Sequence, residues 1–349
     1  MSESIGEVSR EFFSEVVLPL LECEMPEVAA RTAFGIFGLG SEAYGLDDEL
    51  SRDHHWGLRV DALMPADLFA AKRDALLELI SRRVPATYRG HALRAGHLKG
   101  AGVAPDSLPA FLTRTIGIDH PPETYTEWLM APEEDIVHVT NGSVWHDPDG
   151  RFTAVRNVFR SHYPEPVRLR RIAHWCRYFS GMGTYALKRA ILRNNGFYAT
   201  TRFAVAIRLG VQLAFLLDRV YFPYDKWLVS AFTRLPRLYA PLGPLVDEAV
   251  QLNTSWDRKL EILDRMADIL DETMVADGII RPHAKFVGTD TSGYRLLEHA
   301  YAELIQAVPE EIKTVVPVWD QIYLEQFHSR YVDSMPLDQW DAILGLHVE

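Results

Sequence analysis

An apolar run ends in a glycine-rich turn near the start of the chain, in the sequence Phe34-Gly-Ile-Phe-Gly-Leu-Gly40-Ser41. The run is typical of a buried strand, and the glycines are typical of a tight turn. Backbone N–H groups at a helix start after such a turn are free, and the positive end of the helix dipole favours a phosphate there. The segment therefore predicts a strand, a turn and a phosphate site at Gly40 and Ser41.

A carboxylate and an imidazole follow this turn, in the sequence Ser51-Arg-Asp53-His-His55-Trp-Gly57. Asp53 and His55 are two positions apart, so in an extended strand their side chains point to the same face. Both groups could then reach one divalent ion. The two motifs together predict a metal site next to a phosphate site.

The composition indicates a folded protein with a small or locally steered ligand. A chain of 349 residues with 48% hydrophobic content can bury a large core, most plausibly in two domains. Acidic residues outnumber basic ones by 48 to 36, which argues against nonspecific binding to nucleic acid. We therefore expect small-molecule partners and no nucleic acid.

No membrane or export signal is expected. The most apolar stretch, residues 203–222, contains Arg208, Asp218 and Arg219, which predicts a buried helix rather than a membrane span. Two distant cysteines do not form a disulfide framework, and residues 1–10 lack the apolar segment of a secretory signal. The expected location is the cytoplasm.

Strands and helices alternate in the first part of the chain, which indicates an α/β or α+β architecture. Hydrophobic spacing predicts strands over 32–39, 56–64, 88–98 and 142–146, and helices over 7–22, 65–82, 108–116, 125–130 and 133–139. From Glu165 onward the spacing is helical, with a central apolar helix over 201–221. We expect a first domain over residues 1–160 and a helical bundle over residues 161–349.

Gly40-Ser41 followed by Ser51-x-Asp53-x-His55 resembles the signature of the nucleotidyltransferase superfamily, which includes aminoglycoside nucleotidyltransferases. The longer stretch from Gly40 to Arg59 is similar to a bacterial, nucleotidyltransferase-like family described as domain of unknown function 4037. Further matches occur at residues 144–150, 163–166 and 222–227, so the resemblance covers roughly residues 34–240. It implies an α+β fold: a small mixed-sheet nucleotidyltransferase-like domain followed by an all-helical bundle domain.

The resemblance also implies a reaction, in which a nucleoside monophosphate moves from a nucleoside triphosphate, ATP as first choice, to a small-molecule acceptor. Gly40 and Ser41 would hold the triphosphate, and Asp53 would hold Mg²⁺ or Mn²⁺. The second position of the carboxylate pair is His55, a poor ligand for Mg²⁺ but an acceptable one for manganese or zinc. The third carboxylate, expected on the strand predicted over 88–98, has no acidic residue to fill it at Ala92–Leu98.

Each candidate residue also has a plainer interpretation. Arg59 shares a predicted strand face with Asp53, so it is either the electrostatic partner of Asp53 or a phosphate contact. Lys226, beside Tyr224, either reaches nucleotide phosphates from the helical half or anchors a surface turn. A catalytically degenerate, nucleotide-binding or regulatory protein of the same fold is the alternative to an active enzyme.

Overall fold

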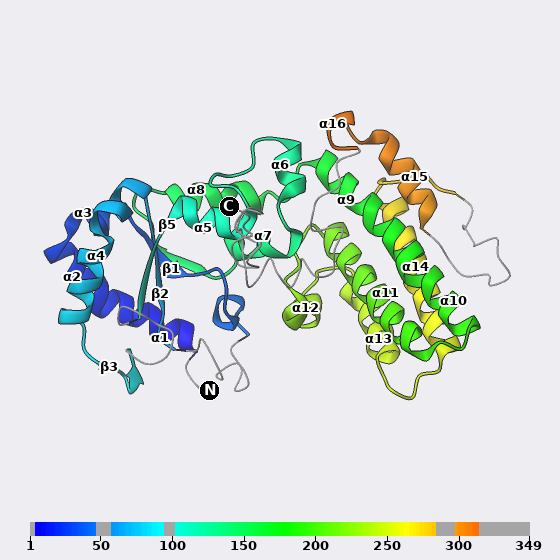
Figure 1. The fold of residues 1–349 in the computed structure, drawn as a ribbon, viewed down its shortest axis with the longest axis horizontal. Helices are drawn as coiled ribbons and strands as arrows, with labels where there is room; N and C mark the ends of the chain where they lie inside the picture. The colour runs from blue at the N-terminus through cyan, green and yellow to red at the C-terminus, as the bar shows by residue number, and fades with distance from the viewer. Residues whose placement is uncertain (1–3, 47–56, 94–101, 284–296, 314–349) are drawn as a thin grey trace, which may run out of the picture. The chain divides into compact units, whose positions relative to one another are not determined.

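The computed structural model of the chain describes residues 4–46, 57–93, 102–283 and 297–313 (Figure 1). These residues form two compact units, which we describe separately. Unit 1 lies within residues 1–122 and 135–161, and unit 2 within residues 123–134 and 162–317. Unit 1 combines a mixed β-sheet with helices and unit 2 is helical, so the fold class is α+β, as predicted.

Unit 1 is built on a four-stranded sheet in the order β5-β2-β1-β6. Strand β1 is antiparallel to both of its neighbours, whereas β2 and β5 are parallel. The strands are β1 (Ala33–Ile36), β2 (Val60–Met64), β5 (Val103–Ser107) and β6 (Ser143–His146). The helices are α1 (Ile5–Phe12), the π-helical turn η1 (Phe13–Val17), α2 (Leu18–Glu24), α3 (Pro26–Arg31), α4 (Ala66–Arg83), α5 (Leu108–Ile116), α7 (Glu133–Thr140), which enters unit 1 at Asp135, and α8 (Arg151–Arg160).

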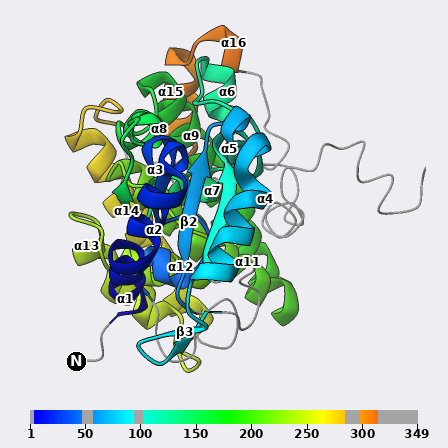
Figure 2. The ribbon, with the colours of Figure 1, turned by 90° about the vertical axis from the view of Figure 1, so that its left-hand side faces the viewer.

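The two faces of β2 have different environments because successive strand residues point to opposite sides. Val60, Ala62 and Met64 are buried in the core of unit 1 together with apolar residues of α1–α4. Figure 2 shows α4 and the N-terminal helices beside these strands. Asp61 and Leu63 therefore belong to the other face, where a polar site can form.

One predicted strand of the sheet was wrong. In the described part of the stretch predicted as one strand over 88–98, β3 (Thr87–Tyr88) and β4 (His91–Ala92) form a separate hairpin, and β5 is the strand that pairs with β2. Residues 94–98 lie outside the described residues. Pro105 inside β5 conceals this strand in the sequence, because proline cannot donate to a strand ladder. At the edge of the sheet, where β5 lies, the missing donor is tolerated.

Unit 2 is a set of packed helices around the apolar helix α11 (Gly196–Leu217), which contacts α9, α10, α14 and the π-helical turn η4. By length and composition α11 could span a membrane, but 67% of its most apolar window is buried, as in a core helix. The predicted buried helix is confirmed. The other elements are α6 (Tyr125–Met130), α9 (Glu165–Tyr178), η4 (Phe179–Tyr185), α10 (Ala186–Leu192), α12 (Asp225–Phe232), α13 (Tyr239–Ala249), α14 (Trp256–Ala276), α15 (Glu298–Ala307) and α16 (Glu310–Lys313).

A buried ion pair attaches the segment 123–134 to α9 within unit 2. The Arg171 guanidinium lies 2.5 Å from Glu133 Oε1, and the two side chains are 1% and 3% exposed. Arg171 also donates to the carbonyl oxygens of Trp128, Leu129 and Ala131, while the Trp175 indole donates to Glu133. Buried charges need such partners, because each loses its hydration on folding.

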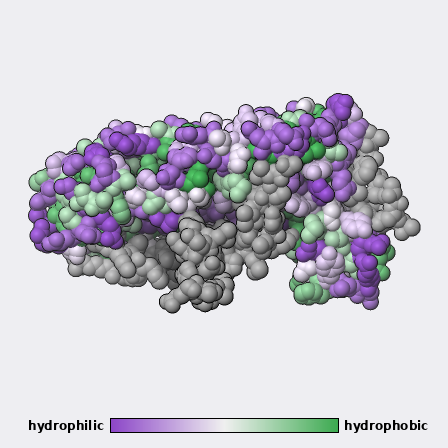
Figure 3. Space-filling view, turned by 45° about the horizontal axis from the view of Figure 1, so that its top comes forward, coloured by the Kyte–Doolittle hydropathy of each residue, from purple (hydrophilic) through white to green (hydrophobic). Residues whose placement is uncertain are grey.

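The surface facing the viewer in Figure 3 is mostly hydrophilic, with hydrophobic side chains scattered in small groups. Among the described residues, the most exposed large apolar side chains are Leu252, in the turn between α13 and α14, and Phe197, on α11. Scattered apolar residues of this kind are normal on a folded protein.

His162 in unit 2 is buried among aromatic rings. It stacks on Tyr221 with 4.8 Å between ring centroids and meets Tyr163 edge-on at 4.7 Å. Burial, with smaller contributions from cations that include Arg168 and Arg219, lowers the pKa of His162 from 6.5 to about 3. The folded protein therefore keeps this imidazole neutral at a pH where the unfolded chain protonates it.

This difference predicts acid-sensitive stability. Because the pKa of His162 is lower in the folded state, its contribution is complete above pH 6.5 and is lost as the pH falls toward 3. Between pH 7.5 and 5.0 the free energy of unfolding should fall by about 2 kcal/mol from this group alone. Urea unfolding at both pH values should show a smaller fall in His162→Asn, since asparagine does not titrate and tolerates the positive φ of 65°. An equal fall in both proteins would contradict the assignment.

Candidate functional site

The turn after β1 has the glycine conformations that the sequence predicts. Gly38 and Gly40 have φ values of 79° and 116°, a region that favours glycine. A Cβ atom on Gly40 would lie 2.6 Å from Glu42 Oε1 and 2.8 Å from Arg59 Nη1, so a side chain has no room there. The helix that follows, η2 (Ser41–Tyr44), is a single 3₁₀ turn that ends at Gly45, shorter than the expected helix.

Arg59 fastens this turn to the start of β2. Its guanidinium donates to the carbonyl oxygens of Phe37 and Leu39, both at 2.8 Å. It also pairs with Glu42 at 2.6 Å and with Asp61 at 3.1 Å. The side chains of Arg59 and Glu42 are 12% and 3% exposed, so this contact is largely shielded from water. In the described part of the chain, Arg59 positions the turn through these four acceptors.

Asn141 holds the turn from the other side of β1. Its amide nitrogen donates to the Gly38 carbonyl at 2.7 Å, and its amide oxygen accepts from the Gly38 N–H at 2.9 Å. The buried Arg156 donates to the carbonyls of Thr140 and Asn141 at 2.5 and 2.7 Å, which orients the chain before β6. The backbone of the turn is thus fixed from two directions.

A cavity of about 520 Å³ opens on the polar face of β2 and β5, and we call it the sheet cavity. Its strand residues share one face because Asp61 pairs with Ala104 and Leu63 with Asp106. The sheet cavity is lined by Phe37, Gly38 and Leu39 of the turn, Arg59, Asp61 and Leu63, Phe69 and Arg73 of α4, Ala104, Pro105 and Asp106, Phe111, Arg114 and Thr115 of α5, and Asp135 and His138 of α7.

The sheet cavity contains charges of both signs. Asp61 accepts from the Phe37 N–H at 2.9 Å as well as from Arg59. Burial raises the pKa of Asp61 above its ordinary value, although the Arg59 charge opposes this shift. Asp106 on β5 is paired with Arg114, and the Arg73 guanidinium, which is half exposed, is paired with Asp74. The lining of the cavity therefore combines carboxylates with cations.

The donor set of the sheet cavity suits a hard divalent cation. Mg²⁺ and Mn²⁺ prefer oxygen ligands, and Asp106, with 24% of its side chain exposed, presents carboxylate oxygens at the cavity wall. Asp61 is more enclosed, at 17%, and each of the two acids is paired with an arginine, Asp61 with Arg59 and Asp106 with Arg114. Of these two strand acids, Asp106 is the more accessible to a metal ion.

Both acids were missed in the sequence. Asp106 was overlooked because the neighbouring strand was assigned to residues 88–98, and the conclusion that this strand has no acid is wrong for β5. The available signals were the alternation around Asp61 in Val60–Met64 and the short segment Val103–Ser107 after Gly102. Neither signal shows which strands pair.

The residues predicted for the site fall into three groups. In the first group, the Arg59 guanidinium lies beside Gly40, which Ser41 directly follows. Arg59 lines the sheet cavity, whereas Gly40 and Ser41 are not among its lining residues. Asp53 and His55 lie outside the described residues.

Tyr224 and Lys226 belong to unit 2. Tyr224 precedes α12, and the exposed Lys226 lies with its Nζ 4.9 Å from the centre of the Trp227 ring.

Comparison with known families gives a match over residues 128–228, to the family model described as Domain of unknown function (DUF4037). The chain is therefore similar to the DUF4037 family over these residues, which are less than a third of its length. The DUF4037 match runs from α6 to α12, and the turn at Gly40 and strands β2 and β5 precede it. No curated protein matches the chain.

Among solved structures, the chain is similar to a nucleotidyltransferase-like protein from Exiguobacterium sibiricum 255-15. The two sequences are 12% identical, and the alignment covers 83% of this chain and 90% of the other, with a TM-score of 0.39.

Proposed function

We propose that the sheet cavity binds a nucleoside triphosphate, with ATP as first choice, and that the protein transfers the nucleoside monophosphate to a small-molecule acceptor. The observation that carries the proposal is the sheet cavity itself, where the fixed glycine turn, the carboxylates of β2 and β5 and three arginines meet. A volume of about 520 Å³ falls within the range of small-ligand sites.

Each wall of the cavity has a task in this proposal. Arg73 and Arg114 are suited to phosphate oxygens, since guanidinium groups form strong, charge-assisted hydrogen bonds with them. Backbone N–H groups of Gly40 and Ser41 are proposed as further phosphate contacts, in a turn that Arg59 holds in place.

Asp106 and the sequence-predicted pair of Asp53 and His55 would hold Mg²⁺ or Mn²⁺. When bound, such ions neutralise charge on the reacting phosphate oxygens.

Other expectations from the sequence remain part of the proposal. Tyr224 and Lys226 are proposed as further nucleotide contacts, and the acceptor is proposed to be a small molecule because the net charge of −12 disfavours nucleic acid. The cytoplasm is the proposed location.

Pyrophosphate release tests the reaction. The full-length protein with Mn²⁺ or Mg²⁺, labelled nucleoside triphosphates and a metabolite extract should release pyrophosphate and label an acceptor. Asp106→Asn and Asp53→Ala should each lower the rate at least about tenfold. Mutation of residues that merely orient metal ligands already lowers metal affinity or activity by that factor. Asp119→Asn, an exposed acid of unit 1 outside the cavity lining, is the matched control and should keep the wild-type rate.

A nucleotide-binding protein without turnover is the second candidate. Two observations favour this candidate. His55 stands where the superfamily signature has a carboxylate, and the two acids of the cavity strands, Asp61 and Asp106, are each paired with an arginine. Calorimetry that shows nucleotide binding unaffected by added metal, together with no pyrophosphate release, would support this candidate over the enzyme.

A further inference from the structure

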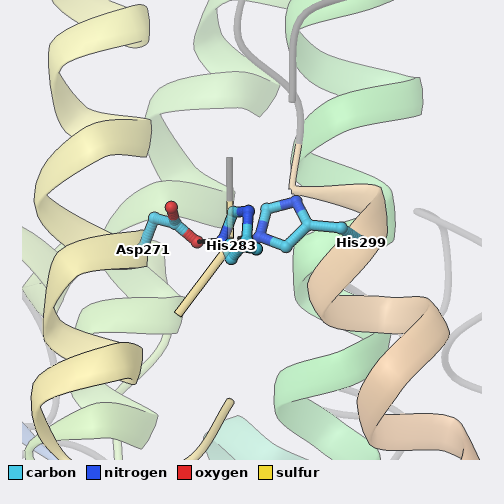
Figure 4. A group of neighbouring side chains, drawn as sticks. All are labelled: Asp271, His283 and His299. Atoms are coloured by element: carbon cyan, nitrogen blue, oxygen red, sulfur yellow. Dashed lines mark hydrogen bonds and ion pairs between the residues drawn. The ribbon is translucent and has the colours of Figure 1, made fainter. Parts of the chain in front are cut away.

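Three side chains far from the sheet cavity in sequence meet inside unit 2. Asp271 lies on α14, His283 lies in the segment after that helix, and His299 lies in the first turn of α15. Figure 4 shows the two imidazoles directed toward the Asp271 carboxylate from separate segments. The cluster is distinct from the proposed nucleotide site, because none of its three residues lines the sheet cavity or is proposed as a nucleotide contact.

The potential ligand atoms are close together. Asp271 Oδ1 lies 3.0 Å from His283 Nε2 and 2.8 Å from His299 Nε2. One ligand atom from each residue can be chosen so that all three lie within 4.8 Å of one another. Zinc bonded to nitrogen and oxygen at about 2.0–2.1 Å in a tetrahedral site keeps its ligand atoms about 3.3 Å apart, so small side-chain shifts would admit the ion.

The buried Asp271 carboxylate favours a cation at the cluster. The residue is only 7% exposed, and both imidazoles approach the same carboxylate oxygen. A divalent ion at this position would compensate the charge of the buried carboxylate.

A neighbouring thiol does not complete a four-residue site. The sulfur of Cys176 contacts Met274 Sδ at 3.8 Å. Among the described residues, the group of mutually close ligand atoms comprises Asp271, His283 and His299 and does not include Cys176. The set is two imidazoles and one carboxylate.

We propose that Asp271, His283 and His299 bind a divalent transition-metal ion of the zinc class. Two nitrogen ligands select zinc and its transition-metal neighbours over Mg²⁺ and Ca²⁺, which prefer all-oxygen sites. Three protein ligands leave a fourth position for water or another ligand. The ion would join α14, the segment that follows it and α15, so its binding stabilises this part of unit 2.

Metal binding to the full-length protein tests the proposal. After treatment with chelator and dialysis, Zn²⁺ binding measured by calorimetry should include one site per chain, and Co²⁺ should give a visible absorption spectrum. Asp271→Asn and His283→Gln should each weaken that site at least about tenfold. Glu272→Gln, an exposed neighbour on the same helix, is the matched control and should leave it unchanged.

Far-UV circular dichroism identifies variants that retain the fold, and His283→Gln is the safer of the two because Asp271 keeps its contact with His299. Zn²⁺ should raise the melting temperature of the wild type and of Glu272→Gln, but not that of the ligand variants. The proposal is overturned if the wild type lacks a zinc site, or if folded ligand variants bind Zn²⁺ as tightly as the wild type does.

Discussion

Replacing Arg171 with methionine is expected to lower the free energy of unfolding by about 3–5 kcal/mol. The substitution leaves the Glu133 carboxylate, 3% exposed, without its cation and removes the donor for three backbone carbonyls. Urea unfolding followed by circular dichroism should measure the loss. Arg177→Met, an exposed arginine on the same helix that donates to the Tyr301 hydroxyl, should cost no more than about 1 kcal/mol.

A double variant distinguishes the cost of leaving Glu133 unpaired from the cost of lost side-chain packing. If the cost comes from a stranded buried charge, Arg171→Met combined with Glu133→Met should be more stable than Arg171→Met alone, because no unpaired charge remains. Equal losses for the Arg171 and Arg177 variants, or a double variant at least as unstable as the sum of its single changes, would contradict this interpretation.

Replacing Arg59 with methionine should also cost about 3–5 kcal/mol and should abolish nucleotide binding as well. Glu42 and Asp61 would lose their common partner, and the carbonyls of Phe37 and Leu39 would lose a donor. The matched control is Arg73→Met, since Arg73 also lines the sheet cavity but is half exposed and pairs with the exposed Asp74.

Arg73→Met should change stability by less than about 1 kcal/mol, because exposed ion pairs contribute little. Thermal and urea unfolding of both variants give the comparison. If Arg59→Met is as stable as Arg73→Met, the turn does not depend on the contacts made by Arg59.

Much of the local structure could be predicted from the sequence. Helix α5 was predicted with the bounds that the structure has, and α4 was predicted to within one residue at each end, because apolar spacing and proline placement mark them clearly. Strands β1 and β2 were predicted in place but too long.

The pairing of distant residues was not accessible in this way. Asp61 and Asp106 share a cavity only because β2 and β5 are parallel neighbours, and residue spacing does not report strand order. The four acceptors of Arg59 depend on how the glycine turn folds back over the start of β2. The cluster of Asp271, His283 and His299 likewise forms through the packing of α9, α11, α14 and α15, and no local sequence motif predicts it.

Nucleotide binding to the sheet cavity is the most direct test of the proposed function. Calorimetry with a nonhydrolysable ATP analogue and Mn²⁺ should show one site in the wild type, weakened at least about tenfold in Arg73→Met through loss of a charge-assisted contact. Arg83→Met is the matched control, because Arg83 lies on the same helix, has the same 49% exposure and also pairs with an acid, outside the cavity. We predict that Arg73→Met loses affinity for the ATP analogue and that Arg83→Met keeps the wild-type affinity. No binding by the wild type, or equal affinities in the two variants, would contradict a nucleotide site in the sheet cavity.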